Sequence, residues 1–300
     1  MNYLYDGSFD GFLCCIYAHY YTEKADGIFL ESMYQQDMLT PHHIVAVDGD
    51  KAATVYSAIE KKISKHDIRR VYMVFCSSAL GKEGLLLKYV RLGFRLGSKV
   101  GIMYGEPIVS EVLQIEKKVA NEVHRMCGLI RFSEMRRSYG GAPGADADAG
   151  YAGADCGAAR DGAAGACYAG AGPGYTSTDP GYAGTGRAAA PGSAPILYAP
   201  IEPDHDILEF LAPHFCDRYK EDPFIIHDRK RKKALFAAVG EWYITPFAAE
   251  GLLTATDPEA SYRKLWKEYF GTVMIKERAN PECQRRFMPA RYWKNLTECQ

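Results

Sequence analysis

The chain has 300 residues, of which 47% are hydrophobic and 24% charged, a balance that excludes a wholly disordered protein. Its 36 basic and 37 acidic residues nearly cancel, so any nucleic-acid surface must be a local patch. No apolar run is long enough for a membrane helix, and the first residues lack the pattern of a signal peptide. We therefore expect a cytoplasmic protein.

The nine cysteines are scattered and include no CxxC pair, which favours reduced thiols and argues against a zinc ribbon. No CxxxCxxC triplet is present to hold a radical-generating iron–sulfur cluster. The run EPDHD at 202–206 offers potential metal ligands, but its spacing matches no established metal site, and an acidic helix N-terminus explains Asp204 and Asp206 without a metal. We expect neither a metal nor a cofactor.

Residues 1–137 are predicted to be mostly helical. YLYD at 3–6 is typical of a strand, and Ser8 follows as a helix start, with the helix running to about Tyr21. HHIVAVD at 42–48 predicts a buried strand. The spacing of apolar residues then predicts helices near 52–63, 67–80 and 84–96.

The clearest predicted helix begins at Pro107 and ends at Gly128, with an apolar stripe along one face. The opposite face is polar and carries Lys117, Asn121, His124 and Arg125. This face leads into a predicted strand with Arg131, so it could bind phosphate. An ordinary solvated face explains the same pattern, and both interpretations stay open.

Residues 138–195 contain 18 Ala and 15 Gly among 58 residues, with no Leu, Ile, Val or Phe. Because such a segment offers almost no apolar area to offset the entropy of ordering, we predict that it is disordered. Its flanks, 129–136 and 196–202, each look like a short strand and could pair. We therefore predict one domain, 1–300, interrupted by this insertion, with two subdomains, 1–137 and 196–300, as the alternative.

After the insertion, Asp204 or Asp206 could cap a helix that runs to Arg218. Strands are predicted at 223–228, 232–239 and 241–245, and helices near 258–275 and from Pro281. Strands joined by short turns pair antiparallel. The predicted fold is α+β, with a helical N-terminal half and a small, mainly antiparallel sheet flanked by helices.

The C-terminal tail mixes cations with aromatic and amide side chains. Its candidates for nucleic-acid contact are Arg278, Asn280, Gln284, Arg286, Arg291, Tyr292, Trp293 and Lys294. Cations neutralise phosphates, rings stack on unpaired bases, and amides read base edges. We predict phosphate contacts for Arg291 and Lys294 and stacking by Tyr292 or Trp293, although a purely structural role explains the same string.

A second basic run follows the strand that ends in His227 and Asp228. Arg229, Lys230 and Arg231 are part of five successive basic residues, which are predicted to occupy a turn as a phosphate clamp or as an ordinary solvated turn. We include His227 among the nucleic-acid candidates. We do not expect His227 and Asp228 to act as an acid/base pair, because neighbours in a strand point to opposite faces.

Several motifs carry a family resemblance: YDGSFDGFLCCIY at 5–17, VHRMCGLIRF at 123–132, IEPDHDIL at 201–208, LAPHF at 211–215, FIIHDRKR at 224–231 and ERANPECQRRFMPARYWKNLTE at 277–298. Together they resemble a bacterial family of probable DNA metabolism or repair proteins. The resemblance implies a gene neighbourhood with a radical SAM protein for DNA modification or repair, and in some members fusion to a uracil-DNA glycosylase domain. Because this sequence ends at Gln300, we expect no fused glycosylase.

The sequence contains no phosphate loop, no GxSxG elbow and no dinucleotide fingerprint, so none of these motifs indicates a particular reaction. We expect an accessory protein that binds single-stranded or damaged DNA for a radical SAM partner. An enzyme in which His124, His227 or Asp228 activates water on a flipped base is the alternative, and a subunit that only stabilises the partner is a third. Whether the chain is catalytic stays open.

Overall fold

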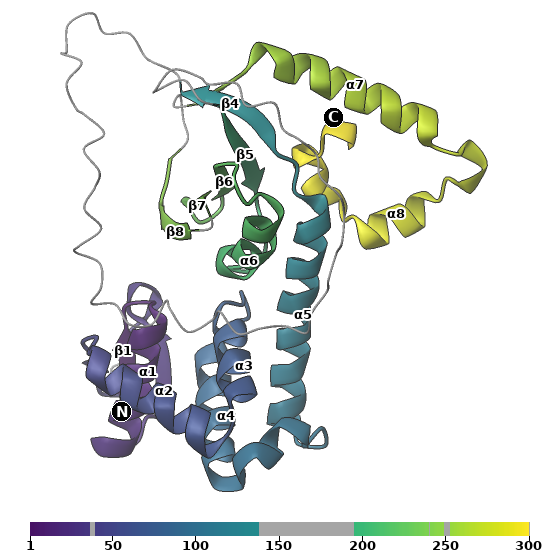
Figure 1. Ribbon diagram of the computed structural model, residues 1–300. Helices are drawn as coiled ribbons and strands as arrows, with labels where there is room; N and C mark the ends of the chain where they lie inside the picture. The colour runs from purple at the N-terminus through teal and green to yellow at the C-terminus, as the bar shows by residue number, and fades with distance from the viewer. Residues whose placement is uncertain (37–39, 138–194, 240, 249–252, 300) are drawn as a thin grey trace, which may run out of the picture. The chain divides into compact units, whose positions relative to one another are not determined.

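The computed structural model describes residues 1–36, 40–137, 195–239, 241–248 and 253–299 (Figure 1). Within them the chain forms two compact units. The N-terminal unit comprises residues 1–118, and the C-terminal unit comprises residues from 119 onward. The boundary falls inside helix α5 (Pro107–Leu129).

The N-terminal unit contains a three-stranded parallel sheet in the order β2-β1-β3. Its strands are β1 (Asn2–Tyr5), β2 (Gly27–Leu30) and β3 (His42–Ile44). Helix α1 (Phe9–Tyr21) follows β1 as predicted, because the Ser8 side chain accepts a hydrogen bond from the Gly11 N–H and caps the helix. The prediction of a buried strand at 42–48 is wrong: β3 is an edge strand with all three residues exposed.

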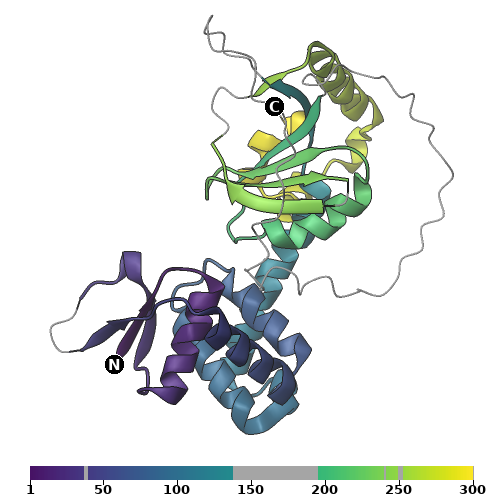
Figure 2. The same ribbon diagram turned by 60° about the vertical axis from the view of Figure 1, so that its left-hand side comes forward.

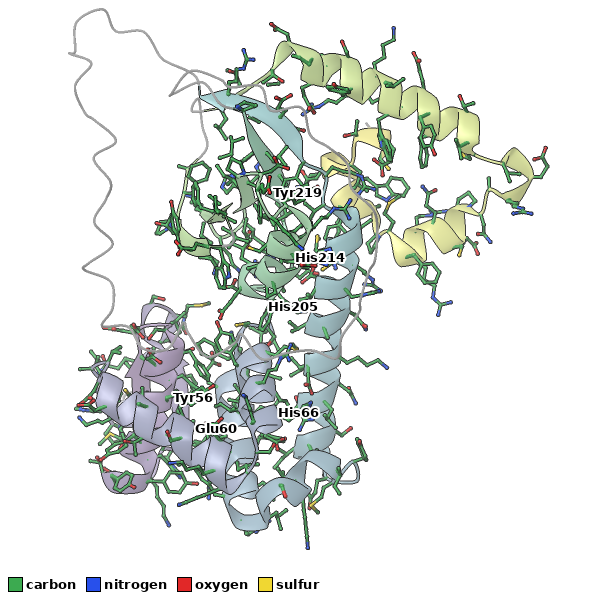
Figure 3. The ribbon with its side chains drawn as sticks, in the orientation of Figure 1. Tyr56, Glu60, His66, His205, His214 and Tyr219 are labelled. Carbon is green, nitrogen blue, oxygen red and sulfur yellow. The ribbon has the colours of Figure 1, made fainter. Side chains whose placement is uncertain are left out.

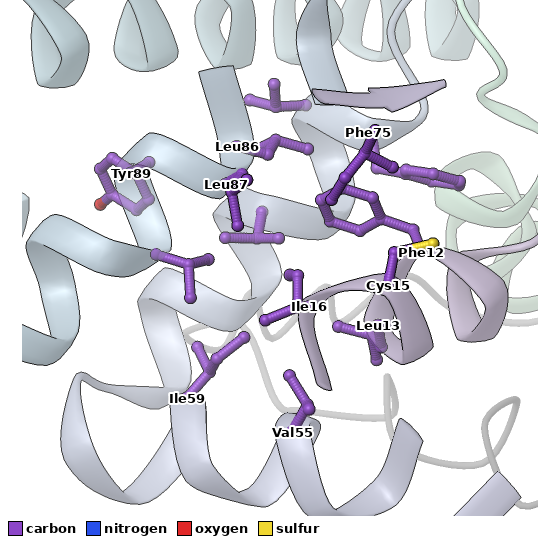
Figure 4. Close-up of a cluster of buried hydrophobic side chains, with 14 of the residues drawn as sticks. Phe12, Leu13, Cys15, Ile16, Val55, Ile59, Phe75, Leu86, Leu87 and Tyr89 are labelled. Atoms are coloured by element: carbon purple, nitrogen blue, oxygen red, sulfur yellow. The ribbon is translucent and has the colours of Figure 1, made fainter. Parts of the chain in front are cut away.

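Three further helices complete this unit: α2 (Gly49–Lys62), α3 (Lys65–Phe75) and α4 (Lys82–Leu96). They confirm the helices predicted from apolar spacing, although α3 ends at Phe75 and not near residue 80. Their buried faces meet α1 in one core, in which Phe12, Ile16, Ile59 and Phe75 are packed together (Figure 4).

Helix α5 begins at Pro107, as predicted, but Gly128 does not end it. The Ile130 N–H still bonds to the Met126 carbonyl, so the helix continues to Leu129. The buried face also differs from the predicted apolar stripe, because Glu122 is buried on it. A buried carboxylate needs hydrogen-bond partners, and those partners organise part of the C-terminal unit.

The C-terminal unit is built on a six-stranded sheet in the order β8-β7-β6-β5-β4-β9. β4 (Ser133–Arg137) pairs antiparallel with β5 (Ile196–Ile201), which confirms the predicted pairing of the insertion's flanks. The predicted disorder of 138–195 concerns residues that lie, apart from Pro195, outside the described part of the chain.

The strands β6 (Phe224–Asp228), β7 (Lys233–Ala238) and β8 (Glu241–Pro246) lie where they were predicted and form an antiparallel meander. β9 (Leu253–Ala255) adds the far edge. One pair, β5 with β6, is parallel, because α6 (Leu208–Arg218) crosses over between them and lies against one face of the sheet (Figure 2). The predicted α+β class is confirmed.

The predicted cap of α6 is wrong. Its N-cap is Ile207, and no side chain caps the helix. The carboxylates of Asp204 and Asp206 are instead paired with Arg291 and Lys233. Each carboxylate therefore forms an ion pair with a cation, and neither accepts the expected hydrogen bond from a backbone N–H at the start of α6.

Two helices after the sheet form what we call the α7–α8 arm, residues 257–287. It consists of α7 (Asp257–Val273), the short turn η3 (Lys276–Arg278) and α8 (Pro281–Phe287). Figure 1 shows the arm standing away from the six-stranded sheet. The chain returns through η4 (Ala290–Asn295) and η5 (Thr297–Cys299). Among the described residues, no helix is both long and apolar enough to cross a membrane.

Candidate nucleic-acid interface

A cleft of about 780 Å³ opens in the C-terminal unit where α7 faces the end of α5 and the end of α6. Its lining combines cations and rings: the arginines are 131, 218 and 263, and the aromatic residues are Phe132, Tyr219, Tyr262, Trp266 and Tyr269. The volume is in the range of pockets that hold small organic ligands. Guanidinium groups and rings together fit a ligand with negative charge and flat surfaces.

The floor of the cleft is an aromatic cluster centred on Phe132. Its ring lies 5.4 Å from Phe215, 4.9 Å from Tyr219 and 5.7 Å from Phe224, centroid to centroid. Tyr219, which is labelled in Figure 3, follows α6 directly and lines the cleft. Because these edge-on ring contacts join α6, β6 and the start of β4, the floor is a packed surface rather than a loose loop.

The opposite wall is α7. Asp257, Pro258 and Glu259 occupy its first turn, where a proline and negative charges favour a helix start. Tyr262, Trp266 and Tyr269 recur at intervals of four and three residues, so they share one helix face. Tyr262 is 63% exposed and Tyr269 57% exposed, so this wall presents open ring surface.

A buried carboxylate fixes two cleft residues. Glu298 Oε1 accepts from the Arg131 guanidinium at 2.7 Å, and Oε2 accepts from the Trp266 indole N–H at 3.1 Å. Burial alone would raise the pKa of Glu298, but its hydrogen bonds, with that from Arg131 the foremost, outweigh burial and hold the pKa below its usual range. The ionised carboxylate therefore positions the Trp266 ring against the rest of the cleft.

The three arginines of the cleft differ in how many hydrogen bonds and ion pairs they form within the protein. Arg263 donates to Glu259 at 2.8 Å and to the Ser133 hydroxyl at 2.7 Å. Arg218 is exposed, forms no ion pair with a carboxylate among the described residues, and lies 5.8 Å from the centroid of the Tyr219 ring. Arg218 is thus the cleft cation most accessible to an incoming anion. Arg131 also has one buried nitrogen, Nε, without a partner in the described structure.

The predicted basic turn faces an acidic loop, residues 202–206, of the same unit. Arg231 donates to Asp228 at 2.8 Å and to the Asp204 carbonyl at 2.5 Å. Arg229 and Lys230 lie 4.0 Å from the carboxylates of Glu202 and Asp204, respectively. These three cations therefore already have acidic partners within the fold.

The tail residues Arg291 and Lys294 meet the same acidic loop. Arg291 is paired with Asp204, and Lys294 with Glu202. Tyr292 is 2% exposed and its hydroxyl donates to Glu122, so its ring has no open face for stacking. Trp293 is half-buried and its indole N–H donates to the Met288 carbonyl at 2.8 Å.

The remaining tail candidates lie on the α7–α8 arm. Asn280 caps α8, accepting a hydrogen bond from the Cys283 N–H at 2.9 Å. Gln284 is exposed on the same helix. Arg278 and Arg286 are exposed, and neither is paired with a carboxylate in the part of the chain that the structure describes.

The other predicted residues do not gather at one place. His124 is exposed on α5, and Arg125 is half-buried beside it. His227 is buried in β6, where its Nδ1 lies 2.7 Å from the Tyr198 hydroxyl. Burial lowers the pKa of His227, and Arg229 lowers it further, so the ring is neutral at physiological pH. Of the predicted set, only Arg131 lines the cleft.

The sequence analysis missed the other cleft residues, although α7 contains a recognisable pattern of aromatic residues at helical spacing. Tyr262, Leu265, Trp266 and Tyr269 form a helical stripe next to Lys264 and Lys267. An apolar stripe is normally buried, so only the structure reveals that this one is exposed. Within the described ranges, no group of three or more His, Cys, Asp or Glu side chains is placed to hold a metal ion.

Comparison with family models matches residues 81–146 and 187–298 to a domain of unknown function, DUF4130. The chain belongs to the DUF4130 family. Both segments that build the cleft, 130–132 and 218–297, lie inside the matched ranges. The cleft is therefore part of the DUF4130 domain. Comparisons with curated proteins and with solved structures found no match.

Proposed function

We propose that this DUF4130 protein is a nucleic-acid-binding accessory protein that holds unpaired DNA in the cleft beside α7. The observation that carries the proposal is the lining of the cleft, which includes three arginines and five aromatic side chains. Rings supply stacking surfaces for bases, and guanidinium groups meet phosphates.

The aromatic lining favours unpaired over duplex DNA. In a duplex the base faces are stacked on one another and only edges and phosphates are accessible, whereas a single strand or an extruded base can place its face against a ring. Trp266 offers such a ring at 40% exposure, held in place by Glu298. Arg218 supplies a cation to the same cleft, and Arg278 and Arg286 add positive charge on the arm.

The choice of DNA and of a partner rests on the resemblance described above. Motifs 123–132 and 277–298, which resemble the DNA metabolism and repair family, include cleft residues at Ile130, Arg131, Phe132 and Thr297. The same resemblance implies a radical SAM neighbour. We accordingly propose that the protein presents unpaired or damaged DNA to a radical SAM partner.

The experiment is a titration of the purified protein with single-stranded, duplex and uracil-containing DNA at several salt concentrations. We expect the single strand to bind more tightly than the duplex. Trp266→Ala should cost about 1 to 3 kcal/mol of binding energy with little change in salt dependence. Arg218→Ala should lower the slope of log affinity against log salt by about one, because one phosphate contact is lost.

Lys220→Ala is the matched control. Lys220 is an exposed cation two residues from Arg218 that does not line the cleft, so its loss should leave the slope unchanged. Equal affinity for duplex and single strand, or full affinity in Trp266→Ala, would refute a stacking cleft. Base loss from the uracil-containing strand would instead favour the enzyme alternative.

A further inference from the structure

Residues 61–99 of the N-terminal unit form a strongly basic stretch. It contains ten Lys and Arg residues and only two acids, Asp67 and Glu83, which gives it a net charge of +8 in a chain whose overall charge is -1. Both acids are already bonded within the unit. Asp67 accepts from the Arg70 guanidinium at 2.6 Å, and Glu83 accepts from the Tyr5 hydroxyl at 3.0 Å. The positive charge of this stretch is therefore a local concentration that the composition of the whole chain conceals.

Helix α4 carries part of this charge on one face. Lys88, Arg91 and Arg95 follow one another at spacings of three and four residues, so they lie on the same side of the helix. All three are exposed. The ion pairs among the described residues of this unit involve other cations, namely the amino terminus, Lys51 and Arg70. This face of α4 therefore presents three cations to solvent without carboxylate partners in the described structure.

Close packing of α2 against α4 brings a fourth cation beside this face. A Cβ at Gly93 would lie 2.3 Å from the Cδ1 atom of Ile63, so the missing side chain leaves room for the end of α2. Lys62, the last residue of α2, places its Nζ atom 5.7 Å from the centroid of the Phe94 ring on α4. Lys62 is exposed, and it too forms no ion pair within the described ranges.

The end of α1 borders the same face with an aromatic ring. Tyr20 is 48% exposed, and its ring meets the Phe94 ring edge-on, with 5.6 Å between the centroids. Burial raises the pKa of Tyr20, and the charge of Arg91 partly offsets that rise because the guanidinium lies near the hydroxyl. An open ring thus lies next to the cations. We define the α4 basic surface as Tyr20, Lys62, Lys88, Arg91 and Arg95.

The composition of the α4 basic surface favours nucleic-acid phosphates over other anionic partners. Protein interfaces are depleted in lysine and have apolar centres, whereas four of these five residues are cations. A helix that binds an anionic membrane inserts its apolar face, but Leu86 and Val90 on the opposite side of α4 are fully buried in the core. Cations clustered along a helix beside an exposed ring are typical of a surface that binds phosphates and accommodates a base.

We infer that the α4 basic surface is a nucleic-acid-binding surface, separate from the cleft, that contacts the phosphate backbone of a single strand. The inference goes beyond the proposed function, because it assigns binding to the N-terminal unit and does not require the cleft. Phosphate contacts fix the position of a strand without reading its bases, so this surface adds affinity that is independent of sequence.

The test is a salt titration of binding between the full chain and a single-stranded oligonucleotide of thymidines. It is made in a protein whose cleft is disabled by Arg218→Ala and Trp266→Ala, so that the result does not depend on the proposed function. Adding Arg91→Ala and Arg95→Ala should lower the slope of log affinity against log salt by about 1.4, because each phosphate contact on a single strand contributes about 0.7. Both arginines are exposed, so thermal melting should not change.

The matched control is the pair Lys117→Ala and Lys118→Ala in the same background. It removes two exposed cations of α5 that belong to the N-terminal unit but not to the α4 basic surface, so the slope should stay unchanged. An unchanged slope after Arg91→Ala and Arg95→Ala, or an equal loss in the control, would overturn the inference. Loss of binding to phosphatidylserine vesicles with DNA binding intact would also overturn it, in favour of a membrane surface.

Discussion

Glu122 joins three parts of the C-terminal unit through its hydrogen bonds. Its carboxylate is 2% exposed and accepts the N–H groups of Asp204 and His205 at 2.9 and 2.8 Å, as well as the Tyr292 hydroxyl at 2.5 Å. The loop that carries His205, labelled in Figure 3, and the tail turn with Tyr292 are thereby tied to α5. Burial alone would raise the pKa of Glu122, but these hydrogen bonds outweigh it and hold the pKa below its usual range.

Replacing Glu122 by Gln should therefore destabilise the protein in a pH-dependent way. A carboxyl with a depressed folded-state pKa contributes stability that is present above its unfolded pKa, about 4.3, and lost as the pH falls through the folded pKa. We expect Glu122→Gln to lose about 1 to 3 kcal/mol at pH 7, because a buried donor loses its charged acceptor. Urea denaturation should show this difference shrink below about pH 4.

Glu202→Gln is the control for that experiment, since Glu202 pairs with Lys294 on a more exposed surface. Its loss should cost at most about 1 kcal/mol. A Glu122→Gln protein that is as stable as the wild type at pH 7 would contradict the role given to Glu122.

At the level of single residues, the sequence could not predict interaction partners or burial. The basic character of Arg291 and Lys294 was plain from the sequence, but their partners, Asp204 and Glu202, lie about ninety residues earlier in the chain. Tyr292 and Trp293 looked equivalent, yet the first is buried and the second half-buried. Local pattern identifies a side chain's chemistry, while its partner depends on the tertiary fold.

At the scale of elements, periodicity predicted most of the long helices and the meander of β6, β7 and β8. These elements carry their signal in apolar spacing, caps and turns. The short strand β2 was missed, and β3 was misjudged as buried, because three or four residues hold too little pattern to indicate burial. The pairing of β4 with β5 was predicted because the two strands lie directly before and after the Ala/Gly-rich insertion at 138–195.

That pairing leads to a prediction about the insertion. Because β4 and β5 are antiparallel neighbours, a short turn can connect them. Replacing residues 140–193 by a short Gly-containing turn should preserve cooperative unfolding. The smaller loop-closure entropy should leave stability unchanged or raise it by about 2 kcal/mol or less. Thermal melting of the full chain and of the shortened chain measures the effect, and a shortened chain without a cooperative transition would show that the insertion is structural.

At the scale of the whole molecule, the cleft is assembled from segments that are far apart in the sequence. Arg131 and Glu298 are 167 positions apart and in hydrogen-bond contact. The sequence could predict Arg131 as a nucleic-acid candidate, but not that Arg218, Tyr219 and Trp266 would join it. The fold class followed from local patterns, whereas the site required the arrangement of α5, α6 and α7.

The central claim is that unpaired DNA lies in this cleft, and photo-cross-linking tests it most directly. A single strand carrying photoreactive thymidine analogues is irradiated with the protein, and the attached peptides are identified by mass spectrometry. The account predicts cross-links in residues 130–132, 218–219 and 262–269, which line the cleft, and their loss at α7 in Trp266→Ala. Cross-links confined to the N-terminal unit, or to the paired cations around residues 202–206, would contradict it.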